Sequence, residues 1–486
     1  MSGINLEYSE PIGPLADVLA KRYASPEFKA LYSEEGKTFM ERGLWIAIMQ
    51  EQASLGMDIP EADIQDYIDK QGEINLESIM ERELVSGHDV NAKIDEFNEL
   101  AGHQHIHRGM TSRDLTETIE QLQTMLGLDL IKIRVAATLG RFASRAAEYS
   151  TLPMSGRTHN VAAQTITLGK RFANYGEELI GGYDRLTTLR DTYAFRGIKG
   201  PVGTQQDMLD LFGGDVDKVW LLEGRIAEKL GFKDVMGSVG QVYPRSLDFN
   251  VVTALKQISS GPTNFSNSLR LMAGHDLATE GFAEGRVGSS AMPHKMNASR
   301  SERIAGLSAV LSGFVTMAGE VANRQWNEGD VSCSVPRRVY LGGSFMAIDG
   351  VLQTTMNVLD NFGAYPNVIN AELERYLPFL TTTKVLMAAV KAGIGREDAH
   401  KIIKGHATAA ALRIRETGAT DNDLFTRLRE DEKFAAIDMD AVQEATKRPI
   451  ELTGLAEHQV ADFVSEVETI LSDNPAAQNY VPARIL

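Results

Sequence analysis

The sequence predicts an all-α protein built around a bundle of long helices. Apolar residues recur at helical spacing in five long segments, whereas alternating, strand-like segments are scarce. Proline and glycine interrupt the pattern near residues 110 and 365. Because long amphipathic helices need apolar partners along their whole length, we expect a bundle that is shared between subunits.

The first long helix is expected directly after the segment Thr111-Ser-Arg-Asp114. Its apolar residues follow the i, i+4, i+7, i+11 spacing of a helix at Leu115, Ile119, Leu122 and Leu126. The pattern continues to about Phe142, which makes this helix longer than average. Four similar patterns predict helices over 162–193, 245–276, 301–326 and 337–362. Within 245–276, the segment Ser259-Ser-Gly-Pro262 is expected to kink or break the helix.

These elements suggest three domains. The segment Gly363-Ala-Tyr-Pro366 is typical of a turn and follows the last of the five long helices. We therefore divide the chain into an N-terminal helical domain over 1–111, a central helical-bundle domain over 112–364 and a C-terminal helical domain over 365–486.

The composition narrows the classes of partner. The 486 residues carry a net charge of −17, which argues against nucleic acid but leaves a small anionic substrate open, because a positive cleft is a local feature. No apolar run approaches the roughly 20 residues that span a bilayer, and the N-terminus has no secretory signal, so no membrane partner is expected. The single cysteine, Cys333, excludes an intrachain disulfide and favours the cytoplasm.

The segment from Gly285 to Asn297 contains the most chemistry. Its glycines free the backbone, Pro293 restricts it, and two hydroxyls, Lys295 and Asn297 lie close together. Such a loop can close over an anion and surround it with donors. On composition alone it is also an ordinary Gly/Ser surface loop, and Ser299-x-x-Glu302 fits a capping box that leaves Glu302 only a structural task.

The string Gly288-Ser-Ser-Ala-Met-Pro-His-Lys-Met-Asn297 resembles the signature G-S-S-x-M-P-x-K-x-N of the fumarase/aspartase superfamily and matches it at every fixed position. Further segments resemble the adenylosuccinate lyase branch, at 21–25, 107–112, 196–205, 240–245 and 380–393. The resemblance implies a three-domain fumarase/aspartase-like fold and a homotetramer whose sites are shared between three subunits. It also implies release of fumarate from adenylosuccinate, giving AMP, and from SAICAR, giving AICAR, in purine nucleotide biosynthesis, without a cofactor or metal.

The resemblance assigns the catalytic roles. Ser289 is the general base, although the residues alone make Ser290 as plausible, and its alkoxide needs a nearby cation such as Lys295. His159 is the general acid, since histidine can donate a proton near neutral pH. Glu302 orients His159, and His88 orients the substrate.

The same match assigns residues that bind substrate. They hold the nucleotide, its phosphate and ribose, or the succinyl carboxylates, and are Arg22, Tyr23, Asp89, His107, Thr111, Ser112, Thr158, Gln241, Asn297, Arg303, Ser334 and Arg338. Thr111 and Ser112 are expected to cap a helix as well.

Three positions depart from the family pattern. Gly87 stands where a basic residue usually precedes His-Asp-Val, Val161 stands where glutamine is common, and Gly329 stands where arginine is common. Each removes a polar contact to an anionic substrate. Either other residues compensate, with Arg157 and Arg324 as candidates, or the substrate differs.

Alternative interpretations remain. The alternating His103, His105 and His107 could bind a metal on one face of a strand, but the sequence offers no evident further ligand and the resemblance assigns His107 to phosphate. A sister enzyme, such as an argininosuccinate lyase or a carboxymuconate cycloisomerase, is disfavoured by the segments 196–205 and 240–245. A catalytically inactive homologue with a structural or binding role is disfavoured by the intact catalytic residues.

Overall fold

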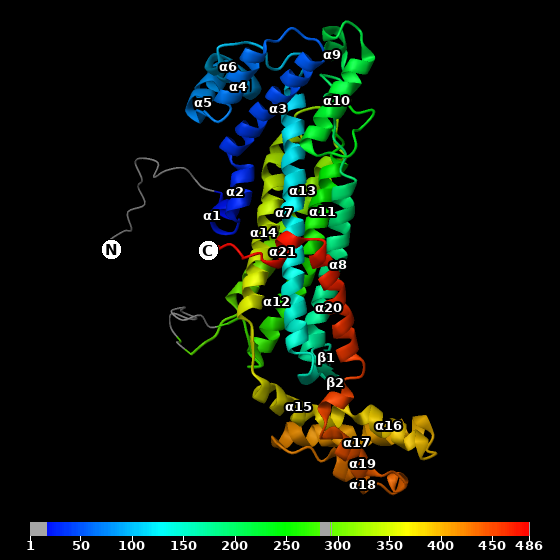
Figure 1. The fold of residues 1–486 in the computed structure, drawn as a ribbon. Coiled ribbons are helices and arrows are strands. Elements are labelled where there is room, and N and C mark those ends of the chain that lie inside the picture. Colours follow the sequence, from blue (N-terminus) through cyan, green and yellow to red (C-terminus); the bar gives the residue numbers. More distant parts are fainter. Residues whose placement is uncertain (1–16, 282–291, 293, 486) are drawn as a thin grey trace, which may run out of the picture.

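The computed structural model describes residues 17–281, 292 and 294–485. Figure 1 shows an elongated helical bundle with smaller groups of helices at its two ends. The N-terminal helices are α1 (Val18–Arg22), α2 (Pro26–Tyr32), α3 (Glu34–Ser54), α4 (Glu61–Lys70), α5 (Leu76–Ser86) and α6 (Asp89–Ala101). The elements at the opposite end are α15 (Pro366–Leu380), α16 (Thr382–Lys391), α17 (Arg396–Thr417), α18 (Leu424–Arg429), η1 (Glu432–Phe434), α19 (Met439–Thr446) and η2 (Pro449–Leu452).

The bundle confirms the predicted all-α class with long central helices. Its helices are α7 (Ser112–Glu148), α8 (Leu168–Asp191), α11 (Ser246–Ile258), α12 (Ser260–Gly274), α13 (Ser299–Ala322) and α14 (Ser334–Asn361). The short α9 (Gln206–Leu211) and α10 (Val216–Leu230) lie beyond the end of α8. Helix α7 packs against α8 and α14, and α13 packs against α11, α12 and α14. Helices α7, α8 and α14 carry buried residues along their whole length, so their contacts run along most of each helix.

One predicted helix begins later than expected, and the predicted break in another is confirmed. The helix expected over 162–193 begins only at Leu168, because 161–167 form strand β2 (Val161–Thr167), which pairs antiparallel with β1 (Pro153–Thr158). This strand is rich in β-branched residues, and Thr167 then caps α8 by accepting from the backbone N–H of Lys170. The expected break within 245–276 falls at Ser259, between α11 and α12. A second small sheet pairs β3 (Ala278–Thr279) with β4 (Gly363–Ala364).

The hydrophobic core is divided. One large cluster joins the N-terminal helices to the bundle, and it also contains residues of α20 (Ala456–Ser472) and α21 (Pro475–Gln478). Thus the last part of the chain returns to pack against α7 and α8. A separate cluster lies within 385–439, among α16 to α19. The division at residues 111 and 364 stays a prediction.

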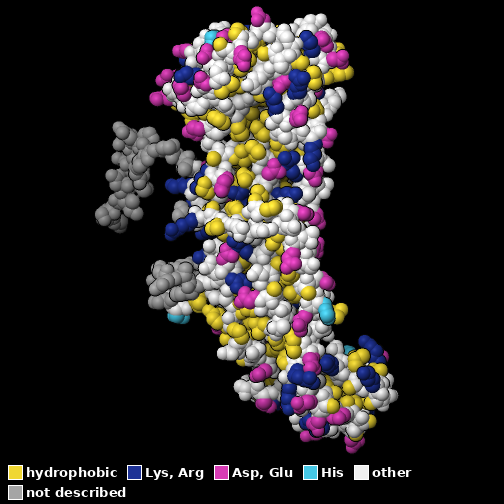
Figure 2. Space-filling model, in the orientation of Figure 1, with side chains coloured by type: hydrophobic (Ala, Val, Ile, Leu, Met, Phe, Trp, Pro, Cys, Tyr) yellow, Lys and Arg dark blue, Asp and Glu magenta, His cyan; other side chains and the backbone are white. Residues whose placement is uncertain are grey.

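Helix α13 is more apolar than we expected from the sequence. By length and composition alone it passes the test for a membrane-crossing helix, the one helix of the described residues that does so. It lies within the bundle, and only 33% of its most apolar 18-residue stretch is buried in one chain. Figure 2 shows further hydrophobic side chains along the face of the bundle on which α7 lies in front in Figure 1. The exposed apolar surface needs a further partner.

Candidate active site

A cleft forms where α12, strand β3, the second half of the signature segment and the start of α13 meet. Its volume is about 770 Å³, and three predicted site residues line it, Lys295, Asn297 and Glu302. Arg270 on α12 adds a second cation to the lining. Ser289 and Ser290 lie outside the described residues. The cleft thus has the cations and the amide that an anionic ligand requires.

A buried carboxylate fixes the beginning of α13 beside this cleft. The side chain of Glu280 accepts from the backbone N–H groups of Arg300 at 2.9 Å and Ser301 at 3.0 Å, and from the Ser301 hydroxyl at 3.1 Å. The residue that precedes α13 is Ala298, so the capping box expected from Ser299 and Glu302 does not form. Glu302 is exposed and reaches the cleft instead.

Two predicted nucleotide contacts lie close to the start of α13. The Arg303 guanidinium stands over the Tyr23 ring, 5.7 Å from its centroid. Tyr23 is held there because the next segment is anchored: Ser25 donates its N–H to Asp349 at 2.6 Å and accepts from Arg134 at 2.9 Å. Arg22 is exposed at the end of α1. We call Tyr23, Lys295, Asn297, Glu302 and Arg303 the signature group.

A second set of predicted residues lies at the N-terminal ends of α7 and α14. Thr111 is the N-cap of α7, Ser112 is its first residue and Ser334 is the first residue of α14. Arg113 links the two helix starts by donating to the Ser334 hydroxyl at 2.7 Å. Helix N-termini favour anions, so these two together form a candidate phosphate site. Arg338 is exposed one turn into α14.

His107 adjoins this candidate phosphate site as a neutral donor. Its Nδ1 accepts from the Trp45 indole at 3.1 Å, which puts the proton of the neutral ring on Nε2. Burial lowers the pKa of His107, against the opposing effect of Asp114. His88 also acts on this pKa, so the two histidines are electrostatic neighbours. His88 is the N-cap of α6, and Asp89 follows it as the first residue of that helix.

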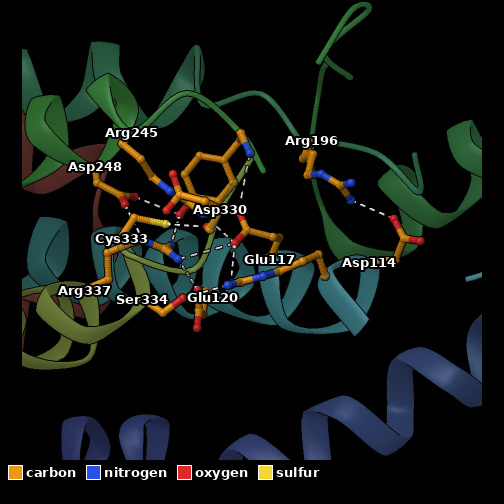
Figure 3. Close-up of polar contacts among 12 residues, drawn as sticks. Asp114, Glu117, Glu120, Arg196, Arg245, Asp248, Asp330, Cys333, Ser334 and Arg337 are labelled. Carbon is orange, nitrogen blue, oxygen red and sulfur yellow. Dashed lines mark hydrogen bonds and ion pairs between the residues drawn. The ribbon is translucent and has the colours of Figure 1, made fainter. Parts of the chain in front are cut away.

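Buried ion pairs hold the segments 196–205 and 240–245 at this end (Figure 3). Asp114 Oδ1 accepts from Arg196 at 2.7 Å and from the N–H groups of Lys199 and Gly200 at 2.9 and 3.1 Å, while Asp114 Oδ2 accepts from the Thr111 N–H at 2.8 Å. Arg196 also donates to the Gly240 carbonyl at 3.2 Å, next to the partly buried Gln241. The predicted site residues at this end of the bundle are named together as the phosphate-site group: His88, Asp89, His107, Thr111, Ser112, Gln241, Ser334 and Arg338.

A neighbouring network fixes α14 against α7. Glu117 accepts hydrogen bonds from Nη1 and Nη2 of Arg245, each at 2.7 Å. Arg337 pairs with Asp248 at 2.7 Å and with Glu120 at 2.6 Å. Burial opposes ionisation of Glu120, but Arg337 and Lys37 lower its pKa to about 2. Arg196 and Arg245, from the family-like segments 196–205 and 240–245, are therefore buried supports of the site, as is Arg337.

The predicted acid, His159, lies at the tip of the β1–β2 hairpin. His159 and Asn160 form a two-residue turn with φ of 51° and 60°. Positive φ at both positions is the mark of a type I′ turn, which suits a tight hairpin. A histidine held at positive φ is strained, and such strain is concentrated at functional sites. Thr158 and His159 are exposed, and in the described part of the chain no hydrogen bond or ion pair joins His159 to Glu302.

Two of the three departures from the family pattern have a local structural explanation. Gly87 ends α5 with φ of 67°, and Gly329 has φ of 146°, both in the region that favours glycine. Val161 is 63% exposed at the first position after the hairpin turn. Both suggested replacements are already ion-paired, Arg157 with Glu372 at 2.9 Å and Arg324 with Glu320.

In one chain the phosphate-site group lies far from both the signature group and the hairpin pair Thr158–His159. Helix α7 has 37 residues and spans about 55 Å, with the phosphate-site group at its beginning and the hairpin just beyond its end. Helix α14 has 28 residues and spans about 40 Å, with Ser334 at its beginning and the β3–β4 pair near the signature cleft at its end. One nucleotide cannot contact all three places in a single chain.

Sequence reasoning missed three residues. Arg113 directly follows Thr111 and Ser112, which match the family pattern, so the sequence did contain a signal for it. Glu280 and Arg270 lie in segments without a motif, and only the fold brings them to the cleft. The histidine triplet also divides, because His107 turns to Trp45, whereas His103 and His105 face Asp63.

Known proteins resemble the chain over nearly its whole length. A family model described as lyase matches residues 32–313, and one described as adenylosuccinate lyase C-terminus matches residues 378–463. The adenylosuccinate lyases of Saccharomyces cerevisiae and Schistosoma mansoni are each 32% identical, over 92% of this chain and 93% of theirs. That of Schizosaccharomyces pombe is 30% identical, over 94% of this chain and 95% of its own.

Solved structures share the fold. The 3-carboxy-cis,cis-muconate lactonizing enzyme from Pseudomonas putida has a TM-score of 0.80 at 17% identity, covering 93% of this chain and 99% of its own. A fumarate lyase from Mesorhizobium has a TM-score of 0.78 at 19% identity, covering 93% of this chain and 100% of its own. At such identities the likeness concerns the fold alone.

Proposed function

The chain belongs to the adenylosuccinate lyase family, and from this premise we propose that it releases fumarate from adenylosuccinate and from SAICAR, leaving AMP and AICAR. The observation that carries the proposal is 32% identity over 92% of the chain, with both family models matched in order. The signature segment is intact within that match. The activity is that of a carbon–nitrogen lyase in purine biosynthesis.

The proposed reaction is a β-elimination. Ser289, as alkoxide, removes the proton from the carbon beside one succinyl carboxylate. That electron pair forms the double bond of fumarate as the bond to nitrogen breaks. His159 then supplies a proton to the departing nitrogen, so that atoms and charges balance. Lys295 and Asn297 support this proposal because both line the cleft, where they can hold the carboxylate that gains charge.

Binding of the nucleotide is divided in this proposal. Tyr23 and Arg303 hold the nucleotide next to the signature cleft, supported by their 5.7 Å contact. The helix starts at Ser112 and Ser334, joined by Arg113, hold the phosphate. His107 donates from Nε2, as the direction of its pKa and its bond to Trp45 favour a neutral ring.

We propose a homotetramer in which three subunits supply the three groups of each site. Two observations support association. The phosphate-site group is separated from the other two groups by the lengths of α7 and α14. Helix α13 is apolar, but only 33% of its most apolar stretch is buried in one chain. The bundles of neighbouring chains would cover α13 and bring the beginning of one α7 to the end of another. The cytoplasm is the proposed location, since the lone Cys333 suits a reducing compartment.

The test is turnover of adenylosuccinate by the purified chain, followed as loss of the succinyl-purine absorbance. Turnover of adenylosuccinate and SAICAR supports the proposal. No turnover of either, with turnover of argininosuccinate instead, refutes it.

The base assignment has a matched pair of variants. Ser289→Ala is expected to abolish turnover while the assembly stays intact by size-exclusion chromatography, whereas Ser290→Ala keeps measurable activity. If Ser289→Ala keeps full activity, Ser289 is not the base.

A further inference from the structure

A cluster of histidine and aspartate lies outside the site described above, between helix α4 and the loop that follows α6. Asp63, His103 and His105 each turn one ligand atom toward a common point, with these atoms all within 4.8 Å of one another. Asp63 Oδ2 lies 2.7 Å from His105 Nε2 and 3.4 Å from His103 Nδ1. We propose that this cluster is a binding site for one divalent transition-metal ion of the zinc class.

The ligand set suits such an ion. Two imidazole nitrogens and one carboxylate oxygen are common zinc ligands, with water completing a tetrahedron. Bonds of about 2.0–2.1 Å place tetrahedral ligand atoms about 3.4 Å apart, and His103 Nδ1 and Asp63 Oδ2 already have that spacing. The contact between Asp63 and His105 must open by several tenths of an ångström to admit the ion.

A second carboxylate fixes the tautomer of His103. Its Nε2 lies 2.8 Å from Asp66 Oδ2, so Nε2–H donates to that carboxylate. In the neutral ring the Nδ1 lone pair then faces the Asp63 carboxylate, and two acceptors oppose one another across 3.4 Å. A cation between them removes the conflict. A carboxylate behind a metal-bound histidine is the usual arrangement of zinc sites.

The backbone of the site is already rigid. Tyr67 is fully buried, its hydroxyl lies 2.8 Å from the His103 carbonyl, and it accepts the His105 N–H at 3.2 Å. Asp63, Asp66 and Tyr67 share one face of α4 by their i, i+3, i+4 spacing. The ligand side chains are partly exposed, at 16–27%, so an ion can enter.

One residue opposes binding. Arg108 donates to His105 Nδ1 at 2.7 Å, which keeps the His105 proton on Nε2, toward Asp63. To bind a metal through Nε2, His105 must shift that proton to Nδ1, and the Arg108 side chain must withdraw. Arg108 also carries a positive charge beside the ion. Its removal is therefore expected to strengthen binding.

The test is calorimetric titration of the untagged full-length protein with Zn²⁺ at pH 8, where histidine is largely neutral. We expect one ion per chain. His103→Gln and His105→Gln each weaken binding by about 100-fold or more, and Asp66→Asn weakens it by roughly 10- to 100-fold. The control is His406→Gln, since His406 pairs with Asp431 at 2.7 Å with similar exposure, and among the described residues no second histidine joins this pair.

Arg108→Gln keeps the test decisive if a ligand variant unfolds, because it is expected to increase the affinity at least several-fold. Thermal unfolding of each variant without metal shows whether it is folded. Equal Zn²⁺ binding by the wild type and by folded His105→Gln, or weaker binding by Arg108→Gln, overturns the proposal.

Discussion

Asp114 holds the segments that carry the phosphate-site group, and Asp114→Asn tests how far the site depends on it. The carboxylate is fully buried and accepts four hydrogen bonds, from Thr111, Arg196, Lys199 and Gly200. Asparagine has the same shape but only one acceptor oxygen and no charge. Whichever way the amide is turned, its NH₂ group faces a donor.

The cost follows from these contacts. The Arg196 guanidinium loses its carboxylate, and its remaining acceptors are the carbonyls of Gly197, Gly200 and Gly240. Breaking a buried ion pair costs about 3–5 kcal/mol, which includes the unsatisfied donors. For 486 residues that unfold together, about 4 kcal/mol lowers the melting temperature by roughly 4 °C. Because Thr111 and the 196–200 segment shift, kcat/KM is expected to fall roughly 10- to 100-fold.

Glu96→Gln is the matched control. Glu96 pairs with the buried Arg42 at 2.6 Å, and Arg42 likewise donates to three carbonyls. In the described part of the chain neither Arg42 nor Glu96 forms a hydrogen bond or ion pair with a residue of the three site groups, so the control should lose similar stability but keep kcat/KM per folded enzyme. Melting is followed by circular dichroism and activity by succinyl-purine absorbance. Equal kcat/KM in both variants would refute the role given to Asp114.

Three further predictions concern single residues. Arg113→Gln should raise KM roughly tenfold or more with little change in kcat, because a charge-assisted contact to bound phosphate is lost; an unchanged KM in steady-state kinetics contradicts this. Glu120 has a folded pKa of about 2 against an ordinary 4.5, so it stabilises the fold above pH 4.5 by about 3 kcal/mol, a contribution lost as the pH falls through 2. Glu120→Gln should therefore flatten acid unfolding over this range, and an unaltered acid transition counts against it. Burial lowers the pKa of His107, so its imidazole NMR signals should titrate below pH 6.5, whereas titration at or above 6.5 disproves the neutral assignment.

The fold could be predicted from the sequence wherever a single helix shows a clear apolar periodicity. The spacing of Leu115 and Ile119 predicted α7, and Pro262 marked the break before α12. The β1–β2 hairpin was missed, because the apolar positions of 162–167 also fit a helix and only pairing with 153–158 decides between them. Short segments are decided by their neighbours, which the local pattern does not contain.

The site was predictable as a set of residues but not as an arrangement. The signature match identified Lys295 and Glu302, which the fold brings to one cleft. It did not reveal that Glu280 caps α13, since that contact joins residues some twenty positions apart without a motif. Nor did it show that Gly87 and Gly329 are set by backbone conformation.

Activity in mixed assemblies tests most directly whether separate chains complete each site. His159→Gln and Lys295→Ala should each be inactive alone. When they are unfolded together and reassembled in equal amounts, a site that takes His159 from one chain and Lys295 from another is intact with a chance of about one in four, so about a quarter of wild-type activity should return. Lys295→Ala mixed with Glu302→Gln is the control, because both residues line the cleft of one chain and no recovery is expected. Absence of recovery in the first mixture, with tetramers present, would contradict the account.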